Sequence, residues 1–125
     1  MKEPNRFQKL VAQAKQQVTE ISAVDAWKQV EGGDAILVDV REESDWREGH
    51  AHGARHLSRG VIELEIEEEI SDLKKPIICY CGGGSRSALV SESLQKMGYE
   101  NVRSIAGGLR AWKEAGLPTV KENAE

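Results

Sequence analysis

Cys81 and Arg86 are the two residues whose types and spacing most clearly indicate chemistry. The four residues between them are Gly82, Gly83, Gly84 and Ser85. Glycine has no Cβ, so a run of glycines can adopt positive φ and turn successive backbone N–H groups toward one centre. Such a ring of amides binds an anion, and a cysteine inside it has a lowered pKa and a reactive thiolate at neutral pH. The spacing therefore predicts a nucleophilic cysteine held in an amide cradle.

Alternative roles remain open for both residues. The guanidinium of Arg86 carries a permanent charge and a rigid set of donors that suit an anion, but the side chain can also tie the loop to the preceding segment. A cysteine at the end of a strand is commonly an inert core residue, and a glycine-rich loop can serve only to turn the chain tightly. If the loop is a cradle, a β-branched residue at Gly83 should reduce activity more than stability, because it disfavours positive φ.

The loop connects the strongest expected strand to a clear helix. Residues 76–81 form an apolar run that ends at the cysteine, and apolar residues recur at helical spacing from Ser85 onward. The other expected helices cover residues 5–17, 23–31, 42–48 and 109–115, and the other expected strands cover residues 18–21, 35–38, 54–57 and 101–105. Residues 61–70 fit both a strand and a helix, and their glutamates favour a solvated helix.

This alternation of strands and helices predicts an α/β fold. Continuous apolar strands are buried on both faces, as in parallel sheets. We therefore expect a central, mostly parallel five-stranded sheet flanked by helices on both faces. Ligands bind beyond the carboxyl ends of the strands in such sheets, and Cys81 is expected at that position on a central strand.

Composition limits the class of protein and the class of partner. The chain has 125 residues, 39% hydrophobic residues and a net charge of −4, which fits a single globular domain rather than a disordered chain. The acidic balance disfavours nucleic acid as a partner, and no apolar run approaches the roughly 20 residues of a membrane span. The first residues lack the apolar core of a signal peptide, so we expect a cytoplasmic protein with no membrane partner.

The two cysteines of the chain, Cys79 and Cys81, are separated by Tyr80 alone. A disulfide between them would close a small, strained ring. Both are therefore expected as free thiols, as is usual in a reducing compartment. For Cys79, the roles of a small core residue and of a resolving thiol are both open.

Residues 80–88 resemble the active-site loop of the rhodanese-like sulfurtransferases, in which a cysteine begins a short loop that an arginine closes. Two further motifs resemble this family in the same order along the chain. The first contains Asp39, Val40, Arg41, Glu42, Trp46, Gly49, His50, Gly53 and Ala54, and the closing motif contains Gly107, Gly108, Trp112, Gly116 and Pro118. A departure at Ala51, where the family has a branched apolar residue, concerns local packing rather than chemistry.

The resemblance implies a rhodanese-like domain over residues 18–120. Residues 1–17 are then an N-terminal helical extension expected to pack on the sheet, and residues 121–125 are a flexible tail. Cys81 is expected to take the outer sulfur of thiosulfate or of a persulfide donor and to pass it to cyanide, a thiol or a protein cysteine. The loop between Cys81 and Arg86, with Arg86 itself, then binds the substrate, and no metal or organic cofactor is required.

Asp39 and Arg41 are expected beside the site as a supporting pair. Such a pair more often orients loops through charge-assisted hydrogen bonds than it contacts a substrate. Three arginines, Arg41, Arg55 and Arg59, could reach the rim of the site and hold an anionic donor.

Histidines and tryptophans give weaker signals. The histidines, His50, His52 and His56, suggest a metal cluster by type, but no acidic or thiol ligand stands beside them at a suitable spacing. We therefore expect no metal. The tryptophans, Trp27, Trp46 and Trp112, are expected to anchor the core.

Two other functions compete with a sulfurtransferase. A cysteine-dependent phosphatase or arsenate reductase uses a related loop, but with one more residue between the cysteine and the arginine. The shorter loop favours a single sulfur atom over a phosphoryl group with its three equatorial oxygens. A non-enzymatic binding module typically lacks the cysteine, whereas a persulfide carrier dedicated to one protein partner stays open beside the enzyme.

Overall fold

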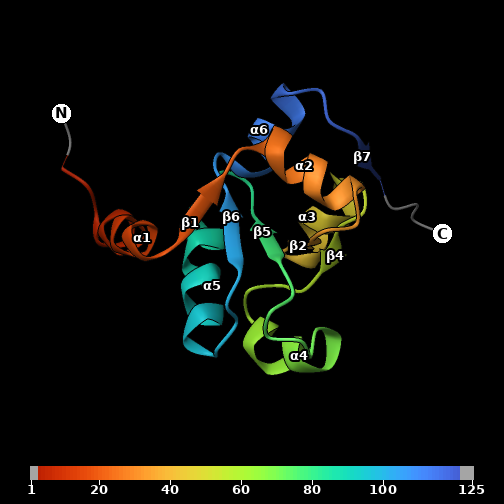
Figure 1. Cartoon of the computed structure of the whole chain (residues 1–125). Helices are drawn as coiled ribbons and strands as arrows, with labels where there is room; N and C mark the ends of the chain where they lie inside the picture. Colours follow the sequence, from red (N-terminus) through yellow and green to blue (C-terminus); the bar gives the residue numbers. More distant parts are fainter. Residues whose placement is uncertain (1–2, 122–125) are drawn as a thin grey trace.

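The computed structural model describes residues 3–121 and is built on a parallel sheet of five strands. The strand order is β1-β6-β5-β2-β4 (Figure 1). These strands are β1 (Thr19–Ile21), β6 (Val102–Ile105), β5 (Ile77–Tyr80), β2 (Ile36–Asp39) and β4 (Arg55–His56). The helices are α1 (Arg6–Gln17), α2 (Ala23–Glu31), α3 (Glu43–Glu48), α4 (Ile62–Glu69), α5 (Ser85–Lys96) and α6 (Gly108–Glu114). The expected α/β fold is confirmed, and each pairing within this sheet is parallel.

Helices cover both faces of the sheet, as expected. One face packs against α4 and α5, and the other packs against α2 and α6. Successive side chains of a strand point to opposite faces, so Cys79 and Cys81 lie on the α4/α5 side while Ile78 and Tyr80 lie on the α2/α6 side. Burial of both faces explains the continuous apolar runs of the strands. Among residues 3–121, no helix has the length and apolarity needed to cross a membrane.

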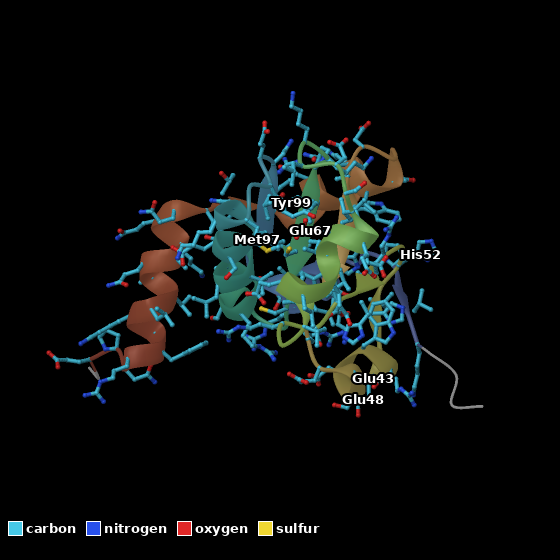
Figure 2. All side chains as sticks on the ribbon, turned by 90° about the horizontal axis from the view of Figure 1, so that it is seen from below. Glu43, Glu48, His52, Glu67, Met97 and Tyr99 are labelled. Carbon is cyan, nitrogen blue, oxygen red and sulfur yellow. The ribbon has the colours of Figure 1, made fainter. Side chains whose placement is uncertain are left out.

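The N-terminal helix α1 lies beside α5 in both views of the molecule (Figures 1 and 2). The side chain of Asn5 caps its first turn, in agreement with the sequence. Val11 and Ala14 are buried against Ala88 and Leu89 of α5. The helical extension therefore packs mainly on a helix, whereas we expected it on the sheet. Of the tail predicted over residues 121–125, positions 122–125 lie outside the described residues.

Residues 61–70, which fit both a strand and a helix, contain the helix α4. Ile62, Ile66 and Ile70 are buried at intervals of four residues, and the glutamates between them are exposed. At the far end of α5, Met97 packs against the α4/α5 core, and Tyr99 donates a hydrogen bond to the Ile70 carbonyl at 2.6 Å. Figure 2 labels Met97 and Tyr99 together with Glu67 of α4.

A second, two-stranded sheet was not expected from the sequence. It pairs β3 (His50–Ala51) with β7 (Thr119–Val120) in antiparallel orientation. The carbonyl of Pro118 beside it accepts the backbone N–H of His52 at 3.0 Å and the indole N–H of Trp112 at 2.8 Å. Strands of two residues carry no detectable pattern of alternation, so this sheet becomes visible only when the two segments are seen together.

Candidate active site

Cys81 directly follows β5, the middle strand of the sheet, and lies at the carboxyl ends of the parallel strands. Tyr80 is level with Asp39, the last residue of the neighbouring β2. Helix α5 begins at Ser85, so the loop between strand and helix is short. Only 2% of the surface of Cys81 is exposed. The position predicted for Cys81 is therefore the observed one.

Hydrogen-bond donors converge on the sulfur of Cys81. The N–H of Gly84 lies 3.1 Å from Sγ, the N–H of Ser87 lies 3.4 Å from it, and the hydroxyl oxygen of Ser87 also lies at 3.4 Å. Burial by itself would raise the pKa of the Cys81 thiol. The hydroxyl and amide of Ser87 and the amides of Gly84 and Gly83 outweigh burial, so this pKa is lowered below its ordinary value. The loop thus favours a thiolate.

The three loop glycines differ in conformation. Gly84, which precedes α5, has φ +98°, a region that favours glycine. A Cβ at Gly84 would lie 3.1 Å from the nitrogen of Gly107 and 3.3 Å from the carbonyl oxygen of Ile105. Gly82 and Gly83 do not have positive φ, and a Cβ on either would meet no atom within 4 Å. The expectation that Gly83 requires positive φ is therefore wrong, and that requirement belongs to Gly84.

Helix α6 holds the other side of the loop. The N–H of Leu109 donates to the Cys81 carbonyl at 2.8 Å, and the N–H of Arg110 donates to the Gly82 carbonyl at 3.1 Å. Gly108 has φ +55°, and a Cβ there would overlap the Cys81 carbonyl oxygen. Because α6 binds these two carbonyls, the following loop amides remain free to face the sulfur.

Asp39 and Arg41 form a buried pair at the carboxyl end of β2, next to Tyr80. The Nε and Nη2 atoms of Arg41 donate to both carboxylate oxygens of Asp39 at 2.8–3.1 Å, and Nη2 also donates to the Gly49 carbonyl at 2.6 Å. The hydroxyl of Tyr80 donates to Asp39 at 2.6 Å and accepts the Ala51 N–H at 3.0 Å. These contacts tie β2, β5 and β3 together immediately before the loop.

The pKa values in this cluster keep its charges fixed. Burial would lower the pKa of Arg41, but its hydrogen bonds and charge interaction with Asp39 leave that pKa raised. Burial, together with the negative charge of Asp39, raises the pKa of Tyr80 well above its usual range. Tyr80 therefore stays a neutral donor and Arg41 a cation. Their side-chain hydrogen bonds go to Asp39, Gly49 and Ala51 rather than to the sulfur of Cys81.

A model of the Rhodanese-like domain matches residues 22–115. The chain belongs to this family. It is 36% identical over 104 residues to the thiosulfate sulfurtransferase GlpE of Coxiella burnetii (strain RSA 331 / Henzerling II). The matched residues make up 83% of this chain and 94% of the relative. The residues that the family model matches begin after α1, and the domain boundary expected at residue 18 stays a prediction.

Two solved structures resemble nearly the whole chain. The polysulfide-sulfur transferase homodimer from Wolinella succinogenes has a TM-score of 0.80 and 29% identity, covering 95% of this chain and 90% of its own. A protein from Rhodopseudomonas palustris CGA009, described as a possible tyrosine phosphatase, has a TM-score of 0.83 and 28% identity, covering 94% of this chain and 96% of its own. Coverage of this extent takes in at least part of α1.

Arg86 and Cys79 differ in their surroundings. Arg86 is half-buried in the first turn of α5, and its side chain makes no hydrogen bond or ion pair within residues 3–121. Both roles expected for Arg86, binding an anion and holding the loop, stay predictions. Cys79 is fully buried in the α4/α5 core, and burial raises its pKa to about 12 despite a hydrogen bond with Ser91. Its surroundings are those of a core residue.

The histidines serve the scaffold of the domain. The rings of His50 and His56 both stack on the indole of Trp46, with ring centroids 3.4 and 5.0 Å from its centroid. His50 Nδ1 lies 2.9 Å from the Trp46 carbonyl oxygen, and His56 Nε2 lies 2.7 Å from the Arg41 carbonyl oxygen. His52 is exposed beside Trp27. In the part of the chain that the structure describes, no three metal-binding side chains converge.

Gly84→Ala should slow alkylation of Cys81 by iodoacetamide at neutral pH by about tenfold, since a hydrogen bond to a charged group contributes at least 1.5 kcal/mol or so. The new Cβ is strained at positive φ and pushes on Gly107, which displaces the amide from Sγ. Gly83→Ala has space around it and should show a smaller loss. Equal rates for the two variants, with unchanged melting temperatures, would mean that the Gly84 amide does not hold the thiolate.

Three residues of the site were not predicted as functional. Ser87 and Ser104 contribute hydroxyls near the sulfur, and Gly108 allows α6 to approach the loop. The sequence could have indicated Ser87, because a residue in the first turn of the helix after the loop lies close to the cysteine and its side chain carries a hydroxyl. Ser104 and Gly108 come from β6 and α6, and nothing in their own segments indicates contact with the loop.

Proposed function

We propose that this protein is a sulfurtransferase that carries a sulfane sulfur as a persulfide on Cys81. The observation that carries the proposal is the set of donors around Sγ, which lowers the pKa of Cys81 and so favours its thiolate, the nucleophilic form. The relatives that are named thiosulfate sulfurtransferase and polysulfide-sulfur transferase support this type of reaction. Fixed amide dipoles of this kind stabilise developing charge without reorganisation.

The reaction consists of two displacements on one sulfur atom. In the first, the Cys81 thiolate attacks the outer sulfur of thiosulfate. A sulfur–sulfur bond forms to Cys81, the bond to the sulfonate sulfur breaks, and sulfite leaves with the electron pair. In the second, cyanide or a thiolate attacks the outer sulfur, and the bond to Cys81 breaks to return the thiolate. Neither step requires a proton transfer at Cys81.

Anionic donors would be held at the mouth of the site by arginine. Two of the three arginines expected at the rim are occupied: Arg41 binds Asp39, and Arg55 lies 3.9 Å from the carboxylate of Glu69. Arg59 is exposed and follows β4, with its N–H bonded to the Val40 carbonyl at the end of β2. We assign the anionic part of the donor to Arg59 and Arg86. The acceptor is a small thiophile or the cysteine of a partner protein.

Thiosulfate should leave Cys81 heavier by one sulfur atom, in a form that cyanide removes. Intact mass under non-reducing conditions measures this, and a glutathione persulfide donor tests the bulkier class of substrate. The protein should hydrolyse aryl phosphates no faster than a Cys81→Ser control. Phosphoryl transfer needs room and donors for three equatorial oxygens, and the short loop favours a single sulfur atom. Phosphate ester turnover without modification of Cys81 by either donor would replace this proposal with a phosphatase.

A further inference from the structure

Ser87 and Ser104 form a buried pair of hydroxyls behind Cys81. The Oγ of Ser87 lies 3.4 Å from Sγ of Cys81 and 2.8 Å from the Oγ of Ser104. Ser87 belongs to the first turn of α5 and Ser104 to β6, and both are completely buried. Within residues 3–121, the Ser104 hydroxyl has Ser87 as its hydrogen-bond partner and no other. A continuous path of hydroxyls therefore runs from β6 to the sulfur.

The charge on Cys81 sets the direction of these hydrogen bonds. A thiolate can only accept, so the hydroxyl of Ser87 must donate its one proton to Sγ. The Ser87 oxygen is then free to accept, and Ser104 must donate to it. Both protons are thus aligned toward the sulfur, and buried hydrogen bonds in series strengthen one another.

We propose that Ser87 is a catalytic hydrogen-bond donor to the sulfur of Cys81 and that Ser104 positions its hydroxyl. This inference rests on the proposed sulfurtransferase reaction and adds residues to it. Negative charge lies on Sγ in the free enzyme, moves to the outer sulfur in the persulfide, and returns to Sγ when the acceptor attacks. A donor fixed at Sγ therefore stabilises the thiolate twice, as the nucleophile of the first step and as the leaving group of the second.

The two half-reactions should respond differently to pH when the Ser87 hydroxyl is lost. Formation of the persulfide depends on the fraction of Cys81 that is ionised, so a higher pH restores it. Discharge of the persulfide depends on the stability of the departing thiolate, which solution pH does not alter. The ratio of variant to wild-type discharge rates should therefore stay low at every pH. A variant that merely loosened the fold would not separate the steps in this way.

Ser87→Ala should slow alkylation of Cys81 at neutral pH by about tenfold, with recovery to the wild-type rate at alkaline pH. Discharge of its preformed persulfide to cyanide should be slower by a similar factor across the pH range. Ser104→Ala should show the same pattern at about two- to threefold, because it removes only the hydrogen bond that orients Ser87. Stopped-flow measurement of each half-reaction and the pH profile of iodoacetamide alkylation give these values.

Ser91→Ala is the matched control, because Ser91 is equally buried on α5 and its hydroxyl donates to the Ser87 carbonyl at 2.8 Å rather than to Sγ of Cys81. It should leave both half-reactions near their wild-type rates. If Ser87→Ala does not fold, Ser104→Ala alone must show the pH-dependent pattern. Rates of Ser87→Ala equal to those of Ser91→Ala, or a formation deficit that alkaline pH does not repair, would overturn the inference.

Failure of the proposed function has a separate signature. Wild-type protein that gains no sulfur from thiosulfate or from glutathione persulfide would overturn the sulfurtransferase proposal. The alkylation profiles of Ser87→Ala and Ser104→Ala do not need a sulfur donor. They would then still decide whether the two hydroxyls hold the thiolate.

Discussion

Cys81→Ser should abolish sulfur transfer and leave the fold intact. The serine hydroxyl fits the same position and can keep the hydrogen bonds that the cradle offers, but it is not ionised at neutral pH and cannot form a persulfide. Transfer of sulfur from thiosulfate to cyanide should fall to the rate without enzyme. The thermal unfolding curve should change little, because a small side chain is replaced by one of similar shape.

Cys79→Ser is the matched test of the second cysteine. Cys79 is fully buried, and its pKa of about 12 keeps it a neutral thiol at working pH. Ser91 lies within hydrogen-bond reach of Cys79, so it can also form a hydrogen bond with a serine hydroxyl at position 79. This variant should retain most of its transfer activity and lose some stability. Two folded variants that were equally inactive would give Cys79 a part in the reaction as a resolving thiol.

The location of Cys81 and the donors around its sulfur could be predicted because they depend on neighbours in the sequence. A cysteine, three glycines and a helix start within a few residues, so the backbone of one loop supplies most donors to the sulfur. The sheet was predictable for a similar reason. Strands buried on both faces are apolar throughout, and that pattern is contained within each strand.

The supports of the loop could not be predicted, because they join segments far apart in the chain. From its sequence neighbours, Gly108 is expected to be a turn glycine. Only the fold shows that the absence of a Cβ at Gly108 makes room for the Cys81 carbonyl. In the sequence, Ser104 is only a polar residue within a strand. Its hydrogen bond with Ser87 of α5 appears only in the folded structure. The error at Gly83 has another source, since composition shows that a loop is rich in glycine but not which glycine needs positive φ.

Asp39→Ala should lower the free energy of unfolding by about 3–5 kcal/mol, as expected when one partner of a buried ion pair is removed. Arg41 would keep its charge in a site where only 8% of its surface is exposed, with the Gly49 carbonyl as its remaining side-chain partner. Tyr80 would also lose the acceptor of its hydroxyl. Urea unfolding, followed by tryptophan fluorescence, measures the change.

An exposed ion pair on α3 provides the comparison for this prediction. Glu43 and Arg47 lie 3.1 Å apart on the helix surface (Glu43 is labelled in Figure 2), and Glu43→Ala should cost well under 1 kcal/mol. A cost for Asp39→Ala as small as that would show that the buried pair does not hold the domain together. Tyr80 immediately precedes Cys81, so loss of its hydrogen bond to Asp39 should also change the position of the loop. Alkylation of Cys81 should therefore slow in Asp39→Ala, even in buffer where the variant is fully folded, and remain unchanged in Glu43→Ala.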